Sequence, residues 1–147
     1  MTEVTLDTYL TLMHRAFREL VRGPDTVLAQ SGLGRAHHRA LFMIRREGEL
    51  SVGDLATQLA VTNQALHKTL QPLLKQGLVL VRTDEEDARR RRLCLSPGGE
   101  CLERQISGMQ REVFARVRRQ VGDASMADWC RVMAVMEKEA LDQSSGS

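Results

Sequence analysis

The sequence predicts a mostly α-helical fold with one small β-hairpin. Of the 147 residues, 42% are hydrophobic but only 3% are aromatic, and helix formers such as Leu, Ala, Arg and Glu dominate, a composition that favours helices. Apolar residues recur three and four positions apart in several segments, as on a helical face. Apolar residues alternate on both sides of one charged stretch, in "GLVLV" before it and "LCLS" after it. The length suits one domain, which we take as residues 1–147.

Two helices are predicted before residue 50. The first covers residues 5 to about 22 and is expected to stop at "RGPD", because proline and glycine end helices. Its apolar face consists of Leu6, Tyr9, Leu10, Met13, Phe17, Leu20 and Val21. The second lies near 35–47 and is followed by Gly48. Its body contains Ala40, Leu41, Met43 and Ile44.

A pair of short helices joined by about three residues follows. Ser51 with Asp54 three residues later predicts the N-terminus of the first, through a capping box. Thr62 is the expected N-cap of the second, and Gly77 follows its last turn. The inward-facing residues are expected to be Leu55, Leu59 and Val61 in the first, and Ala65, Leu66, Thr69, Leu70, Leu73 and Leu74 in the second.

Pro72 lies inside the second helix of this pair. Proline removes a backbone hydrogen bond and disturbs the preceding turn, so we expect a bend near Lys68–Pro72. Two short strands, about 78–83 and 91–96, come next. Ser96 and Pro97 then predict the start of a long helix that ends at "VGD", and a last helix covers about 124–142.

The order of two helices and a hairpin predicts a winged helix-turn-helix, in which the second helix enters the DNA major groove. The hairpin tip holds "TDEEDARRRR", residues 83–92. Asp87 is the expected anchor of the neighbouring Arg89 through a bidentate pair, which leaves Arg89 and Arg90 to reach DNA. Arg91 is expected on the inward strand face and Arg92 on the outward one. The alternative is a solvated turn whose charges cancel.

The chain resembles the MarR family of bacterial transcription regulators over nearly its whole length. The specific part is "LSVGDLATQLAVTNQALHKTLQPLLKQGLVLVRTDEEDARRRRLCLSPGGE", which is similar to the family's run of strand, helix, recognition helix, "GLV" strand, D-x-R wing and exit segment. The resemblance implies an obligate homodimer that reads a pseudo-palindrome in double-stranded DNA. Residues 34–96 would form the DNA-binding lobe, and residues 1–33 and 97–147 the helical dimerisation region. The one-sided apolar faces of the terminal helices agree with this expectation.

Five residues near the start of the second short helix are the expected major-groove face. Amide side chains can pair with adenine, and Lys can reach guanine or phosphate. The candidates are Thr62, Asn63, Gln64, His67 and Lys68. By the resemblance, Arg89 makes the wing contact and Asp87 orients it. Each of these residues could instead be an ordinary polar residue on a solvated helix face.

The resemblance also implies a repressor that releases DNA when a small, commonly aromatic, ligand binds between the dimer and DNA lobes. The segment "RAHHRALFMIRR", residues 35–46, concentrates His, Phe and Met near the expected cleft. His37, His38 and Phe42 are therefore the candidate ligand residues. The alternative for both histidines is a solvated or structural role.

Other classes of function find little support. The net charge of +2 alone does not demand a polyanionic partner. No segment has the roughly 18 apolar residues of a membrane span, and a cytoplasmic protein is expected. We expect no metal, cofactor or catalytic residues. Cys94, Cys101 and Cys130 are expected to be free thiols, at least two of them buried and inert. A thiol-based redox sensor and a winged helix for protein contact remain alternatives.

Overall fold

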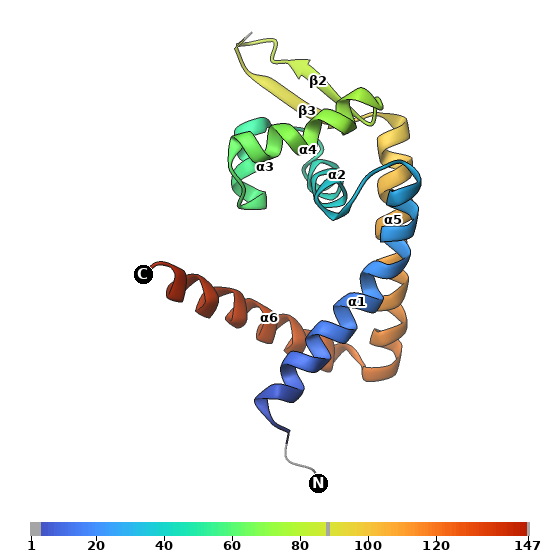
Figure 1. The fold of residues 1–147 in the computed structure, drawn as a ribbon, viewed down its shortest axis with the longest axis vertical. Coiled ribbons are helices and arrows are strands. Elements are labelled where there is room, and N and C mark those ends of the chain that lie inside the picture. The colour runs from blue at the N-terminus through green and yellow to red at the C-terminus, as the bar shows by residue number, and fades with distance from the viewer. Residues whose placement is uncertain (1–3, 88, 147) are drawn as a thin grey trace. The chain divides into compact units, whose positions relative to one another are not determined.

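The computed structural model describes residues 4–87 and 89–146. Its elements are α1 (Leu6–Gln30), α2 (Arg35–Glu47), β1 (Leu50–Ser51), α3 (Val52–Leu59), α4 (Asn63–Lys75), β2 (Val79–Thr83), β3 (Arg91–Leu95), α5 (Pro97–Val121) and α6 (Asp123–Ser144) (Figure 1). The mostly helical prediction is confirmed. The chain divides into two compact units, the first up to Gln110 and the second from Arg111.

A small antiparallel sheet lies in the first unit, with its strands in the order β1-β3-β2. The predicted hairpin is confirmed, since β2 pairs with β3 from Val79 opposite Leu95 to Thr83 opposite Arg91. The short strand β1 adds to the other edge of β3, with Leu50 opposite Leu93. This arrangement makes the two-helix segment and the hairpin one winged helix-turn-helix lobe.

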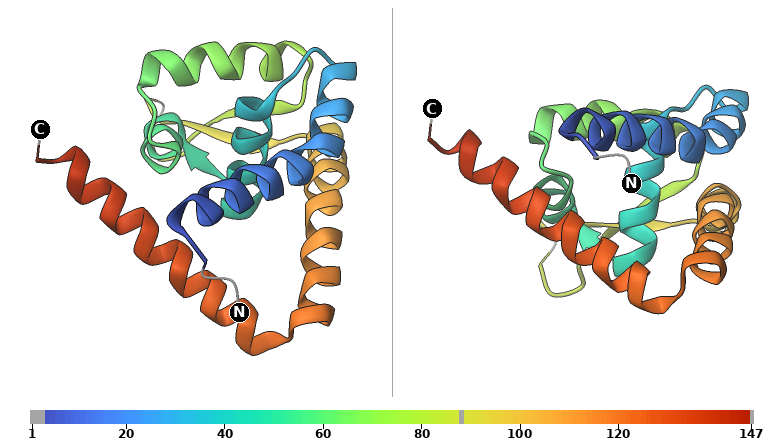
Figure 2. Two further views of the ribbon diagram at one scale, coloured as in Figure 1. Left: turned by 60° about the horizontal axis from the view of Figure 1, so that its bottom comes forward. Right: turned by 90° about the horizontal axis from the view of Figure 1, so that it is seen from below.

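The core of the first unit gathers around α2, which packs against α3, α4 and β3 (Figure 2). Fully buried side chains come from every element around it: Leu28, Leu41, Ile44, Leu55, Leu66, Leu73, Val79, Leu93 and Ile106. The predicted inward face of α4 is confirmed at Leu66, Leu70 and Leu73, whereas Ala65 is exposed. Val61 was also expected inside, but it is 42% exposed because it follows the last turn of α3.

The predicted end of the first helix at "RGPD" is wrong, because α1 continues through Pro24 to Gln30. Proline inside a helix costs about 3 kcal/mol. The apolar stripe continues past it, however, through Val21, Pro24 and Leu28, which are all buried. Burial of a leucine contributes about 1.5–3 kcal/mol, so packing against the rest of the unit offsets the local penalty.

The second proline, Pro72, does not interrupt its helix either, since α4 is continuous from Asn63 to Lys75. The bend expected near Lys68–Pro72 stays a prediction. Leu70 and Leu73 on either side of Pro72 are buried in the core, and their packing holds this turn in place.

The predicted N-termini of α3 and α4 and the predicted end of α4 are confirmed by their hydrogen bonds. Ser51 Oγ accepts from the backbone N–H of Asp54 at 3.1 Å, and Thr62 Oγ1 accepts from that of Ala65 at 3.1 Å. Gly77 has a φ of 69°, a conformation open to glycine. Its N–H donates to the Leu74 carbonyl at 3.0 Å and closes α4.

The junction between β3 and α5 is packed closely against the start of β2. The Leu78 carbonyl accepts from both Ser96 N at 3.0 Å and Ser96 Oγ at 3.2 Å. Ser96 Oγ in turn accepts from Gly99 N at 3.0 Å, which confirms its predicted capping role. A Cβ atom at Gly99 would come within 2.0 Å of the Leu78 carbonyl oxygen. Only glycine therefore fits at position 99.

The second unit contains the last turns of α5 and the whole of α6. Gly122, with a φ of 88°, separates the two helices at the predicted "VGD". Arg118 Nε donates to Asp123 Oδ1 at 2.6 Å across this corner, and this bond lowers the pKa of the Asp123 carboxyl. In the described part of the chain, no helix has the length and apolarity of a membrane span.

Candidate nucleic-acid interface and ligand cavity

The five predicted major-groove residues lie together on the exposed side of α4. Their positions follow from the local sequence, because Thr62 caps the helix and Leu66, Leu70 and Leu73 bury the opposite face. The exposed residues are Thr62, Asn63, Gln64, His67 and Lys68. Figure 2 shows α4 at the surface of the lobe. Two amides, an imidazole and an ammonium group on two successive turns can donate and accept hydrogen bonds along a base-pair edge.

The tip of the hairpin is held by its own acids. The Asp84 N–H donates to the Arg90 carbonyl at 3.0 Å, and Asp84 Oδ1 accepts from Glu86 N at 3.0 Å. Asp87 Oδ1 accepts from Arg89 N at 3.0 Å, and the Asp87 carbonyl accepts from Arg90 N at 3.0 Å. These bonds shape the turn, so the acids have a structural role in the wing. Ala88 lies outside the described residues.

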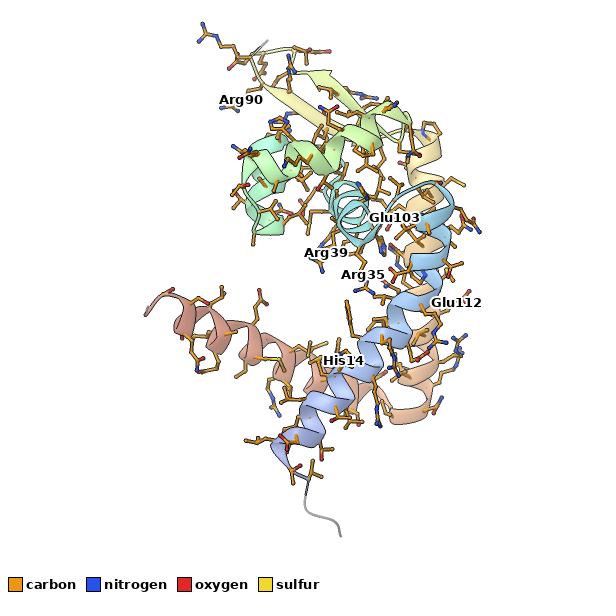
Figure 3. All side chains as sticks on the ribbon, viewed as in Figure 1. His14, Arg35, Arg39, Arg90, Glu103 and Glu112 are labelled. Atoms are coloured by element: carbon orange, nitrogen blue, oxygen red, sulfur yellow. The ribbon has the colours of Figure 1, made fainter. Side chains whose placement is uncertain are left out.

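Asp87 does not form the bidentate pair that was expected with the Arg89 guanidinium. Its contact with Arg89 is through the main chain, and its Oδ2 is 4.0 Å from Arg90 Nε instead. That ion pair is exposed, so water screens it strongly. Arg89 and Arg90 are both exposed at the tip, where Figure 3 labels Arg90. The turn therefore presents two guanidinium groups to a partner.

The next two arginines alternate along β3 as expected, but their exposure is the reverse of what an inward Arg91 and an outward Arg92 would give. Arg91 is exposed, whereas Arg92 is partly buried and its Nε lies 3.7 Å from Asp84 Oδ2. Arg91 shares the side of Leu93, but it pairs with Thr83 near the tip, beyond the reach of the core. Sequence reasoning missed Asp84 as the partner of Arg92. The signal was available, because Asp84 directly follows the strand residue that faces Arg91.

A cavity of about 440 Å³ opens between α1, α2, α3 and the end of the first unit's part of α5. Its lining is largely apolar, and its cationic groups come from α2. The lining residues are Phe17, Leu20, Val21, Arg35, His38, Arg39, Phe42, Met43, Gln58, Leu59 and Gln110. The candidates His38 and Phe42 are among them. Sequence reasoning missed the residues of α1, α3 and α5, because helices far apart in the chain supply them.

The two arginines of the cavity differ in their surroundings (Figure 3). Arg35 binds both carboxylate oxygens of Asp25 at 2.9–3.3 Å and lies 5.5 Å over the Phe17 ring. The hydrogen bond to Asp25 raises the pKa of Arg35. Arg39 is exposed and forms no ion pair among the described residues. Arg39 is thus the cation of this cavity that can meet an incoming anion.

The two histidines of α2 point to different neighbours. His37 does not line the cavity; its Nδ1 accepts from the Gly34 N–H at 2.9 Å and caps α2. Burial lowers the pKa of His37, in keeping with a neutral ring whose Nδ1 accepts. His38 lines the cavity, and its Nε2 lies 2.9 Å from Ser107 Oγ on α5.

The cysteines are free thiols as expected, but their burial differs from the expectation. Cys94 is buried in β3, but Cys101 and Cys130 are exposed, so the expectation of two buried thiols is wrong. All three are free. Among the described residues, no group of three or more His, Cys, Asp or Glu side chains could hold a metal ion.

Comparison with known proteins gives concordant results. A family model described as MarR family matches residues 31–90. The chain is 36% identical over 141 residues to the HTH-type transcriptional regulator PetP of Rhodobacter capsulatus, covering 96% of this chain and 85% of PetP.

Two solved structures share the fold. A single-residue mutant of S. aureus MepR bound to an oligodeoxyribonucleotide has a TM-score of 0.63 and 19% identity, and the match covers 90% of this chain and 98% of the MepR chain. NadR in complex with 4-hydroxyphenylacetate has a TM-score of 0.70 and 24% identity, and the match covers 92% of this chain and 96% of the NadR chain. At these identities the likeness concerns the fold alone.

Proposed function

Because the chain belongs to the MarR family of DNA-binding transcription regulators, we propose that it is a homodimeric repressor of a pseudo-palindromic operator, released by a small aromatic ligand. Residues 34–96 would bind DNA, and residues 1–33 and 97–147 would form the dimer. The observation that carries the proposal is the row of polar side chains on the exposed turns of α4 beside an arginine-rich wing. Polar side chains in such a row can hydrogen-bond to base edges, and the arginines of such a wing can bind phosphates.

In this proposal Asn63 and Gln64 contact base edges, with Thr62, His67 and Lys68 completing the same face of α4. Arg89 and Arg90 reach the backbone or the minor groove from the wing tip. The main-chain bonds of Asp87 support this role, because they fix the turn and leave both guanidinium groups exposed. MepR, which shares the fold, is itself described bound to an oligodeoxyribonucleotide.

The proposed dimer is supported by apolar faces that stay largely exposed in their own unit. On α1 the exposed stripe includes Leu6 at 77%, Leu10 at 71% and Phe17 at 45%. On α6, Trp129, Val132, Val135 and Met136 are each 44–55% exposed. Apolar faces of this extent mark an interface. A second copy of the chain would cover them, and its recognition helix would enter the major groove about 34 Å away.

The proposed ligand is an aromatic acid held in the cavity of the first unit. Phe17, Phe42 and Met43 would contact its ring, while Arg39 and His38 would meet its carboxylate. NadR, a protein of the same fold, is described in complex with 4-hydroxyphenylacetate. A volume of about 440 Å³ suits such a small ligand.

Alanine at Arg89 is expected to weaken operator binding by about tenfold and to reduce the salt slope by about one per lost phosphate contact. The measurement is fluorescence anisotropy of a duplex from the gene's upstream region at several salt concentrations. Arg104→Ala, which removes an exposed arginine from α5, is the control and should bind like wild type. Equal affinity and slope for Arg89→Ala and wild type would leave the wing as a solvated turn. A wild type without preference over random DNA would favour a protein-contact module.

Adding 4-hydroxyphenylacetate to the wild-type complex is expected to release the duplex, because the ligand would favour a conformation that fits DNA poorly. The matched variant is Arg39→Ala, for which the same concentration should release less. An uncharged aromatic alcohol serves as the second control. Release that is equal in both proteins would place the ligand elsewhere.

A further inference from the structure

A buried polar seam joins α2 to α5 within the first unit. Glu103 is completely buried, and its Oε2 lies 2.7 Å from Arg45 Nε. One turn further along α5, Ser107 is 3% exposed and its Oγ lies 2.9 Å from His38 Nε2. Figure 3 labels Glu103 on α5. The seam includes the contacts Arg45–Glu103 and His38–Ser107.

The Arg45–Glu103 contact is an ion pair that hydrophobic burial alone would not produce. Glu103 is the one charged side chain among the fully buried residues that the structure describes. The Nε–H of Arg45 is not aligned with Oε2, so the attraction is mainly between charges. Arg45 keeps 32% of its side chain exposed and lies 5.6 Å over the Phe42 ring. A buried pair of this kind adds little stability over well-packed apolar residues, because both charges lose water.

The seam does restrict geometry. The two contacts are seven residues apart on α2 and four apart on α5, about 10 and 6 Å along the helix axes. A shift of α2 by one residue would turn its side chains by about 100°. Such a shift would break both contacts at once. The seam therefore selects one register of α2 on α5.

The adjacent face of α2 packs on the DNA-binding elements. Ala40, Leu41 and Ile44 are fully buried in the core, where α2 packs against α3, α4 and β3. The recognition helix is therefore attached to α2, and the setting of α2 on α5 determines where α4 stands relative to α5. His38 belongs both to the seam and to the cavity lining, so the cavity borders the His38–Ser107 contact.

We infer that Arg45 and Glu103 are positioning residues for DNA binding: their buried pair fixes α2 on α5 in the register that fits the operator. This inference rests on the proposed function for its DNA readout, but the register itself can be measured without DNA.

The test replaces the pair by apolar residues, Arg45→Met with Glu103→Leu. The control makes the same changes in the exposed i,i+4 pair of α5, Arg104→Met with Glu100→Leu. We expect the seam variant to melt near the wild-type temperature, as apolar replacements of buried pairs commonly do. Its operator affinity should nevertheless fall about tenfold. This is the loss expected if only about one-tenth of the molecules keep α2 in the register that binds the operator. The salt slope should stay that of wild type, since no phosphate contact is lost. The control should bind like wild type.

The register is measured by the distance distribution between two spin labels, one on α4 and one on α5. The labels are attached at Gln71→Cys and Gln105→Cys, in a chain whose exposed cysteines are replaced by Cys101→Ser and Cys130→Ser. Labelled chains are diluted with unlabelled ones to suppress distances between copies. The expected result is a narrow distribution in the parent and a broad or shifted one in the seam variant. An unchanged distribution overturns the inference, as does operator affinity equal to that of the control. If the distribution broadens in the seam variant but the wild-type protein does not bind the operator, the register role is supported and the proposed function is contradicted.

Glu103→Gln separates positioning from simple stability. The amide keeps the shape of the side chain and removes the charge that attracts Arg45. If Glu103 only supports the fold, this variant loses melting temperature while its folded fraction binds the operator normally, and the inference fails. If Glu103 positions α2, operator affinity falls and the spin-label distribution broadens even below the melting transition.

Discussion

Alanine at Gly99 is expected to lower the melting temperature by about 6–12 °C. The added Cβ would meet the Leu78 carbonyl oxygen at 2.0 Å and the carbonyl carbon at 2.9 Å. Both atoms belong to the backbone, which cannot rotate away as a side chain would. Overpacking of this kind costs about 3 kcal/mol, which corresponds to that temperature shift for a chain of this length. Thermal unfolding followed by circular dichroism, at one protein concentration, measures it.

The neighbouring residue provides a matched control. A Cβ at Gly98 would lie 3.7 Å from Ser96 Oγ and 4.0 Å from a Leu78 methyl group, which are ordinary contacts. Gly98→Ala also removes chain entropy from the unfolded state, worth about 0.5–1 kcal/mol in a helix. We therefore expect the melting temperature to stay or rise. Equal loss of stability in both variants would contradict the close approach of α5 to Leu78.

Glutamate at Leu10 is expected to convert the protein into a monomer and to weaken binding to a full operator by about a hundredfold or more. Leu10 lies in the middle of the uncovered apolar stripe of α1 and is 71% exposed in the single chain. In the proposed dimer, a partner would bury this position, and an unpaired carboxylate there costs several kcal/mol. A monomer loses the second half-site and with it the avidity of two linked sites, commonly about 10²–10⁴.

Light scattering after gel filtration gives the mass, and anisotropy gives the affinity. Thr11→Glu introduces the same charge at the next residue, which is exposed and lies off the apolar stripe. This control should remain dimeric. A dimer that survives Leu10→Glu at micromolar concentration would mean that the stripe of α1 lies outside the interface.

Features that depend on a few neighbouring residues could be predicted from the sequence. The caps at Ser51 and Thr62 and the glycine turn at Gly77 are of this kind, since each needs one side chain and one turn of backbone. The hairpin and the exposed face of α4 follow from short periodic patterns in the same way. Most of the proposed DNA-contact surface could therefore be predicted from the sequence alone.

Features decided by distant packing could not be predicted. The local penalty of Pro24 pointed to a helix end, but Leu28 is buried by elements that come later in the chain. Glu103 reads as an ordinary surface residue until its partner 58 positions earlier, Arg45, is placed beside it. The cavity likewise needs helices from both ends of the first unit. The exposure of Arg91 could not be predicted for another reason, because alternation gives the side of a strand but not how far the core extends beneath it.

The Leu78 carbonyl has a consequence for how the wing can vary in length. Together with Ser96, it ties the two ends of the hairpin at a separation of 18 residues. The hairpin is thus a loop closed at its base, and β1 pairs with it only as far as Arg92, below the tip. For a flexible loop, closure entropy grows slowly, by about 0.6 kcal/mol for each doubling of length. Residues added or removed at the tip would change the reach of the arginines at small thermodynamic cost to the lobe.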